Sequence, residues 1–108
     1  MTKNQLNIEE LFSLIKEKMS QNEEGSYTSF LIEKGVEKIS RKVGEEALEV
    51  VMAALAHNVK LTKKTKDDLT GEVCDLFYHS LVLLASQGIE LSAIFAEFHK
   101  RNLKRSSK

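Results

Sequence analysis

The sequence predicts an all-α protein: an antiparallel bundle of four to five helices, completed by dimerisation, in one domain over residues 1–108. Three observations predict this class. The chain contains no Pro and only five Gly, while the helix-forming residues Leu, Ala, Glu and Lys are plentiful. Its apolar residues recur every three or four positions, the spacing of one helix face. Its length of 108 residues suits one domain with a limited interior.

The first helix is predicted over residues 8–19. Asn7 is its expected N-cap, and Glu10, three positions further on, completes a capping box. The apolar residues of this segment lie at helical spacing, and packing in a core explains them without a further role. Residues 21–25 are polar and predict a loop after the helix.

A short second helix and a long third helix are expected next. Ser26 is the expected N-cap of a helix over residues 27–34, which Gly35 is expected to end. A helix over residues 36–58 follows, with Gly44 in its middle. A Gly inside a helix costs roughly 1 kcal/mol relative to Ala. It therefore indicates either the close approach of another helix or of a phosphate, or tolerated packing against a bulky neighbour.

The remaining chain predicts a Lys-rich connection and two further helices. Residues 59–66 contain four Lys and are expected to form an exposed loop, rather than a segment that attracts an anionic substrate. A helix follows from residue 66 or 67 to residue 87, with Gly88 just beyond its end. Because the connection is short, the two long helices should pack antiparallel as a hairpin. A last helix is predicted over residues 91–103.

Composition also excludes several classes of function. Lys and Arg balance Asp and Glu at 16 each, so the chain lacks the basic surface on which nonspecific nucleic-acid binding depends. A single Cys rules out an internal disulfide and fits a reducing compartment. Residues 1–5 lead into an amphipathic helix rather than a signal peptide, and no apolar run is long enough to span a bilayer. We expect a cytoplasmic protein without nucleic-acid or membrane partners.

An acidic cluster lies in the middle of the third predicted helix. Glu45, Glu46 and Glu49 fall within an arc of roughly 100° on the helix, because residues three and four apart share a face. Lys42 projects into the same arc one turn earlier, and Lys38 does so two turns earlier. Taken alone, this cluster is equally well explained as a solvated face stabilised by ion pairs between residues four apart.

A second acidic pair, Glu72 and Asp75, lies in the fourth predicted helix, with His79 one turn further on. The surrounding sequence is mostly apolar, which predicts a buried helix and places Cys74 in the core. Buried carboxylates require cations as partners. The apolar residues cover several sides of this helix, and a partner subunit in a homodimer would bury the excess.

The two clusters together favour a metal site over a solvated face. A pattern of Glu-Glu-x-x-Glu on one helix and Glu-x-x-Asp on its antiparallel neighbour could converge on one or more hard cations. Mg²⁺ prefers oxygen ligands and is commonly held by a few carboxylates together with substrate phosphates. The expected Mg²⁺ ligands are Glu45, Glu46, Glu49, Glu72 and Asp75.

The motifs resemble those of the phosphoribosyl-ATP pyrophosphatase family. The acidic pattern alone is shared by the wider all-α nucleoside triphosphate pyrophosphohydrolases, including MazG-like and dimeric dUTPase-type enzymes. Three further motifs narrow the resemblance to the histidine-pathway family. They are residues 26–28 (Ser-Tyr-Thr), residues 42–47 (Lys-Val-Gly-Glu-Glu-Ala) and residues 78–79 (Tyr-His). The similarity spans residues 26–101. Two departures are Cys74, where a small residue is usual, and the segment from Glu97 to Arg101, where Glu-Leu-x-x-Arg is usual.

The resemblance implies an α-helical fold, a dimer or higher oligomer, Mg²⁺, and release of pyrophosphate from phosphoribosyl-ATP in the second step of histidine biosynthesis. It places Tyr27 and Thr28 near the substrate and gives His79 a supporting role behind the site. Arg101 is a candidate phosphate ligand, across a dimer interface or otherwise, and a surface role is its alternative.

The enzyme hypothesis assigns the carboxylates to Mg²⁺, which bridges the triphosphate. One of Glu45, Glu46 and Glu49 would accept the proton of the attacking water, and Lys38 and Lys42 would bind phosphate oxygens. The α–β phosphoanhydride would then be cut. Two alternatives remain: a house-cleaning (d)NTP pyrophosphohydrolase with the same acids and another base pocket, and a non-catalytic helical dimerisation module.

Overall fold

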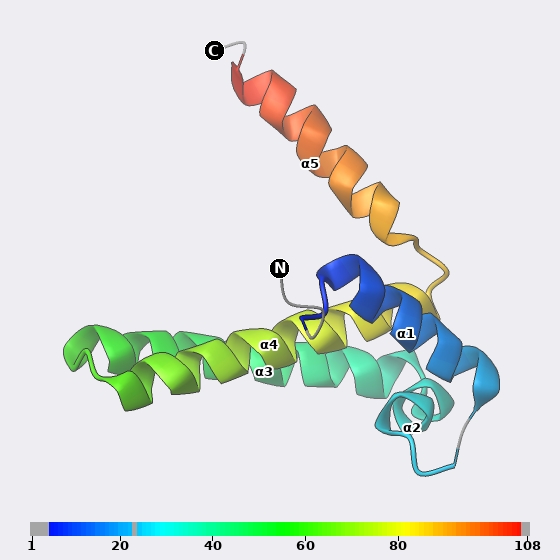
Figure 1. Ribbon diagram of the computed structural model, residues 1–108, viewed down its shortest axis with the longest axis horizontal. Coiled ribbons are helices and arrows are strands. Elements are labelled where there is room, and N and C mark those ends of the chain that lie inside the picture. Colours follow the sequence, from blue (N-terminus) through cyan, green and yellow to red (C-terminus); the bar gives the residue numbers. More distant parts are fainter. Residues whose placement is uncertain (1–4, 23, 107–108) are drawn as a thin grey trace.

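The computed structural model describes residues 5–22 and 24–106, with side chains as far as residue 102 (Figure 1). Within these ranges the chain forms five α-helices and no strand, which confirms the predicted all-α class. The helices are α1 (Ile8–Gln21), α2 (Tyr27–Lys34), α3 (Val36–Val59), α4 (Lys63–Ser86) and α5 (Leu91–Ser106).

The predicted N-caps of the first two helices are present. The Asn7 side chain accepts a hydrogen bond from the Glu10 backbone N–H at 2.8 Å, and the Glu10 carboxylate accepts one from the Asn7 N–H at 3.0 Å. Ser26 caps α2 by accepting a hydrogen bond from the Ser29 N–H at 3.2 Å. Gly35 separates α2 from α3 as a single residue with φ of +94°, a conformation that favours glycine.

The start of α4 differs from the prediction. The helix begins at Lys63, and Thr62 is its N-cap: the Thr62 hydroxyl accepts from the Thr65 N–H, and the Thr65 hydroxyl accepts from the Thr62 N–H, both at 3.1 Å. Ion pairs from Lys63 to Asp67 at 2.8 Å and from Lys64 to Asp68 at 2.9 Å support the first turn. Most of the expected Lys-rich loop is therefore helical.

Helices α3 and α4 form the predicted antiparallel hairpin, and α1 and α2 pack against its end opposite the turn (Figure 1). The main core lies at this end, where α1, α2, α3 and α4 meet. Its buried apolar residues are Phe12, Ile15, Leu31, Ile39, Leu81, Val82, Ala85 and Leu91. The half of the hairpin nearer the turn contributes none of them.

Helix α5 leaves the body as an arm after Gly88, at a bend of 110° from α4 (Figure 1). The radius of gyration is 16.2 Å, whereas about 13 Å is expected for a compact chain of this length. In the described part of the chain no single helix is long and apolar enough to cross a bilayer. Within the described ranges, α4 and the part of α5 up to Asn102 reach the necessary length and composition when taken together across the bend.

Many large apolar side chains are exposed in the single chain, which buries only the last part of the fourth helix. Phe77 on α4 is 54% exposed, and Cys74, expected in the core, is also exposed. On α3, Met52 and Leu55 are 60% and 63% exposed, and on α5 Phe98 is 63% exposed. The prediction used the apolar content of each helix, but burial depends on how many neighbours cover it, and a single chain supplies too few.

Candidate metal centre

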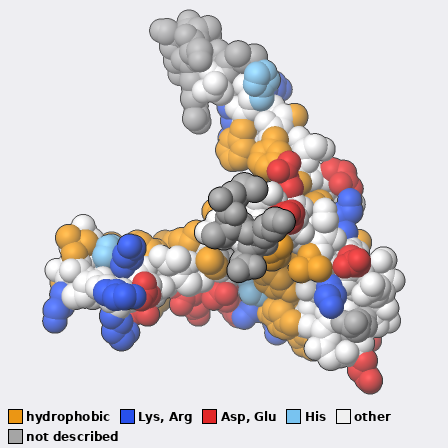
Figure 2. Space-filling model, in the orientation of Figure 1, with side chains coloured by type: hydrophobic (Ala, Val, Ile, Leu, Met, Phe, Trp, Pro, Cys, Tyr) orange, Lys and Arg blue, Asp and Glu red, His pale blue; other side chains and the backbone are white. Residues whose placement is uncertain are grey.

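The antiparallel hairpin brings acids from both helices to one place. Carboxylate oxygens of Glu46 on α3 and of Glu72 and Asp75 on α4 lie within 4.8 Å of one another. In Figure 2 acidic side chains gather along the hairpin, between its Lys-rich end and the body of the molecule. A separation of this size allows one cation to contact all three carboxylates.

The burial of these acids supports a cation site. Glu46 is only 6% exposed, although its sequence neighbours Glu45 and Gly44 are exposed. One oxygen of Glu46 and one oxygen of the half-buried Glu72 are shielded from solvent and have no hydrogen-bond partner among the described residues. An unpartnered buried carboxylate oxygen is costly, so the residues present fit a bound cation. Asp75 is exposed, so the expectation that both acids of α4 are enclosed was wrong for this residue.

Glu49 lies beside the three converging acids, on the side toward the hairpin turn. Its carboxyl group is within hydrogen-bonding reach of Glu72 and raises the pKa of Glu72; partial burial and the charges of Glu46 and Asp75 add to this shift. The crowding of like charges favours any positive ion that enters. Glu49 and Glu72 also open onto a groove of about 460 Å³ between α3 and α4. The other lining residues are Met52, Ala53, Ala56, Thr65 and Asp68.

Glu45 points to a lysine rather than to the other acids. Nζ of Lys42 lies 3.5 Å from a carboxylate oxygen of Glu45 and 3.5 Å from one of Glu46, so one ammonium group forms ion pairs with both acids. Burial alone would lower the pKa of Lys42, but the pKa is raised overall because Tyr27, Glu45 and Glu46 outweigh that effect. Lys38, one turn earlier on α3, is partly buried. Both predicted lysines therefore lie on the same helix as the first acidic cluster.

Tyr27 and Thr28, at the start of α2, contact two consecutive residues of α4. The Tyr27 hydroxyl lies 2.9 Å from Nε2 of His79, and the Thr28 hydroxyl is hydrogen-bonded to the Tyr78 hydroxyl. Thr28 and His79 are buried, at 6% and 5% exposure. Burial raises the pKa of Tyr78, although its bond with Thr28 opposes the shift. The sequence analysis named Tyr78 only as part of the Tyr-His motif and predicted no contact or role for it.

Arg101 lies apart from the acids within one chain. It is exposed near the end of the α5 arm, where its Nε donates a hydrogen bond to Glu97 at 3.0 Å. Helix α5 projects away from the α3–α4 hairpin (Figure 1). Any role of Arg101 at the acidic site therefore requires a second subunit.

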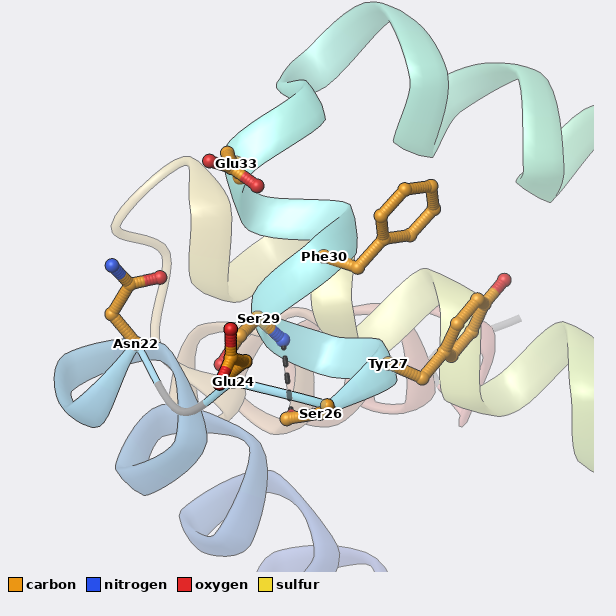
Figure 3. A pocket seen from close by; sticks show the side chains of 8 residues that line it. Asn22, Glu24, Ser26, Tyr27, Ser29, Phe30 and Glu33 are labelled. Atoms are coloured by element: carbon orange, nitrogen blue, oxygen red, sulfur yellow. Dashed lines mark hydrogen bonds between the residues drawn. The ribbon is translucent and has the colours of Figure 1, made fainter.

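A cavity of about 620 Å³ lies between the α1–α2 loop and α2, and Figure 3 shows the side chains that line it. Figure 3 shows the side chains of Tyr27 and Phe30 pointing toward α3 and α4, away from Asn22 and Glu33. Glu24 and Glu33 line the cavity, and none of the three converging acids does. Its acidic lining does not suit a phosphate.

Comparison with known proteins identifies the family. The model of the phosphoribosyl-ATP pyrophosphohydrolase family matches residues 8–102. The chain is 44% identical over 101 residues to a phosphoribosyl-ATP pyrophosphatase of Clostridium novyi, covering 94% of this chain and 86% of the relative. It is 48% identical over 100 residues to a phosphoribosyl-ATP pyrophosphatase of Listeria monocytogenes, covering 93% and 89%.

A histidine biosynthesis bifunctional protein of Oceanobacillus iheyensis is also similar, with 46% identity over 98 residues. The match covers 91% of this chain and 42% of that longer relative. The family model and the relatives of similar length span nearly the whole chain, including all the acids described above. This chain therefore belongs to the phosphoribosyl-ATP pyrophosphohydrolase family.

Proposed function

We propose that this protein is the phosphoribosyl-ATP pyrophosphatase of histidine biosynthesis, and that it releases pyrophosphate from phosphoribosyl-ATP with Mg²⁺ held by Glu46, Glu72 and Asp75. The observation that carries the metal assignment is the convergence of these carboxylates within 4.8 Å, with two buried oxygens that lack hydrogen-bond partners among the described residues. Family membership supports the choice of substrate. Localisation in the cytoplasm accords with this pathway and remains part of the proposal.

The chain's own residues supply the other parts of the chemistry. Glu46, Glu72 and Asp75 would hold the Mg²⁺, which when bound would supply positive charge for the triphosphate and lower the pKa of a water molecule. Lys42, which already serves two carboxylates, and Lys38 one turn before it place further positive charge along the same face of α3 for the phosphate oxygens. Cleavage of the α–β phosphoanhydride leaves phosphoribosyl-AMP and pyrophosphate.

Three acids of α3 are candidates for accepting the proton of the attacking water. Glu45 faces Lys42 at 3.5 Å, and Glu46 is buried and already paired with Lys42. Glu49 is exposed, lies beside Glu72 and opens onto the groove between α3 and α4. Its position makes Glu49 the best-placed general base, since a base needs an open approach to the water.

A homodimer is part of the proposal. The single chain leaves large apolar side chains uncovered on α3, α4 and α5, and its radius of gyration exceeds that of a compact chain. A groove of about 400 Å³ between the end of α4 and α5 has a lining that includes Phe77, Phe95 and Phe98. A second copy that covers these faces also brings its own arm, and with it Arg101, toward this subunit. Tyr27 and Thr28 complete the proposed substrate contacts.

The test is pyrophosphate release from phosphoribosyl-ATP with Mg²⁺ and with EDTA, beside a panel of NTPs and dNTPs. We expect Mg²⁺-dependent turnover of phosphoribosyl-ATP alone, and loss of that turnover in Glu49→Gln. Glu33→Gln is the matched control, because it makes the same change at an exposed glutamate of α2 outside the acidic cluster. Turnover of dNTPs instead would overturn the assignment of phosphoribosyl-ATP as the substrate. Folded protein that turns over none of these nucleotides would overturn the proposal that the protein is an enzyme.

A further inference from the structure

A chain of hydrogen bonds links α2 to the backbone of one of the proposed metal ligands. The Tyr27 hydroxyl lies 2.9 Å from Nε2 of His79, and Nδ1 of His79 lies 2.7 Å from the backbone carbonyl oxygen of Asp75. His79 is 5% exposed, so water competes little for either bond. The carbonyl belongs to the residue whose carboxylate meets Glu46 and Glu72.

The direction of both hydrogen bonds follows from the carbonyl. A carbonyl oxygen can only accept, so Nδ1 of His79 carries the hydrogen that it donates to Asp75. In a neutral imidazole Nε2 is then the acceptor, and the Tyr27 hydroxyl donates to it. The Tyr27 bond therefore holds the imidazole in the tautomer and orientation that reach Asp75.

This turn of α4 lies outside the main core. Cys74, Asp75 and Phe77 are exposed, and the main core begins further along the helix, at Leu81. Tyr27 also affects the pKa of Lys42 on α3, which places it near that side of the acidic cluster as well. Tyr27 thus lies where α2, α3 and α4 meet, beside residues of both helices that carry the acids.

We infer that Tyr27 and His79 are positioning residues, which hold the Asp75 turn of α4 at the place where its carboxylate meets Glu46 and Glu72. They act through Asp75 and not on the reacting atoms. The inference rests on the proposed function only in that the carboxylates hold a divalent cation. It gives the Tyr-His pair and the Tyr of the Ser-Tyr-Thr segment a common physical role.

The neighbouring hydrogen bond between Thr28 and Tyr78 supplies a matched control. Tyr27→Phe and Tyr78→Phe each remove one hydroxyl that joins α2 to α4, but only the Tyr27 hydroxyl leads on to Asp75. His79→Asn is a third variant, since its amide nitrogen can still donate to the Asp75 carbonyl but the shorter side chain has no acceptor at the position of Nε2, which the Tyr27 hydroxyl contacts. The measurement is Mg²⁺ binding by titration calorimetry without substrate, beside thermal unfolding in EDTA.

We expect Tyr27→Phe and His79→Asn each to weaken Mg²⁺ binding by about 10-fold, the lower end of the range for groups that orient metal ligands. The double variant should bind Mg²⁺ no more weakly than either single variant, because both break the same link. Tyr78→Phe should unfold at a lower temperature and keep wild-type Mg²⁺ affinity.

If Tyr27→Phe and Tyr78→Phe weaken Mg²⁺ binding equally, the effect comes from a general loosening of the contact between α2 and α4, and the inference is overturned. Unchanged Mg²⁺ affinity in Tyr27→Phe would also overturn it. The proposed function is tested separately by wild-type protein. Wild-type protein that binds Mg²⁺ but leaves phosphoribosyl-ATP intact would overturn the function, and the positioning role would still be decided by the calorimetry.

Discussion

The Glu46→Gln variant should be more stable than wild-type protein without metal and less stable than wild-type protein with Mg²⁺. Glu46 is 6% exposed, and one of its oxygens has no hydrogen-bond partner in the part of the chain that the structure describes, so in the metal-free protein it is a buried charge that is incompletely compensated. Glu46→Gln removes that charge, and Lys42 keeps Glu45 as its partner. We therefore expect the metal-free variant to unfold at a higher temperature than wild-type protein.

With Mg²⁺ present the order should invert. At a concentration 100 times its dissociation constant, a ligand that binds only the native state stabilises it by about 2.7 kcal/mol. For 108 residues, an unfolding entropy of about 2.1 cal/mol/K per residue converts this into a rise of about 12 °C. If loss of one of the three carboxylates weakens binding by about 100-fold, the same Mg²⁺ concentration stabilises Glu46→Gln by only about 0.4 kcal/mol, or about 2 °C.

Thermal unfolding of both proteins in EDTA and across a Mg²⁺ series measures these shifts. Glu33→Gln, an exposed change outside the cluster, should follow wild-type protein at every Mg²⁺ concentration. A wild-type unfolding temperature that does not respond to Mg²⁺ would refute the cation site. Equal Mg²⁺ shifts in wild-type protein and Glu46→Gln would show that the cation binds elsewhere.

Three further outcomes are expected. Gly44 is exposed, and apart from its chain neighbours and the adjacent backbone of its own helix no atom lies within 4 Å of the place where a Cβ would lie, so Gly44→Ala should raise the free energy of unfolding by roughly 0.5–1 kcal/mol in urea titrations; a decrease would contradict this geometry. The pKa of Glu72 is raised above its ordinary 4.5, chiefly by Glu49, so the folded protein favours the protonated carboxyl group. In EDTA the stability that this protonation contributes is present at pH 4.5 and is lost as the pH rises through the raised pKa. Unfolding temperatures from pH 4.5 to neutrality should show this fall in wild-type protein, less of it in Glu49→Gln and least with saturating Mg²⁺; identical curves would exclude the coupling. Phe98→Glu should shift the molar mass seen by light scattering from dimer to monomer, and a variant that stays dimeric would place the interface away from α5.

Local signals predicted local structure well. The N-cap at Asn7, the cap at Ser26 and the stop at Gly35 all lie where the sequence places them, because each depends on side chains within three or four positions. The start of α4 was missed because Thr62 uses Thr65 to complete its capping box, where the usual signal is Glu or Gln. Sequence reasoning recognised the helix and misplaced its first turn.

The site was harder to predict because it depends on packing between helices. Helical periodicity places Glu45, Glu46 and Glu49 on one face, but it does not show that Glu46 is the buried member. That outcome follows from where α4 crosses α3. The exposure of Cys74 and the direction of α5 depend on long-range packing in the same way, and no motif encodes either of them.

The projection of α5 has a consequence for how the protein folds. An isolated helix of about 15 residues is only marginally stable in water, and beyond its first turns α5 has few neighbours in its own chain. Its backbone amides should therefore exchange hydrogen rapidly at low protein concentration and become protected as subunits associate. In the proposed homodimer, completion of α5 and association of the subunits would be one coupled folding and binding event, and unfolding temperatures of variants would be comparable only at equal subunit concentration.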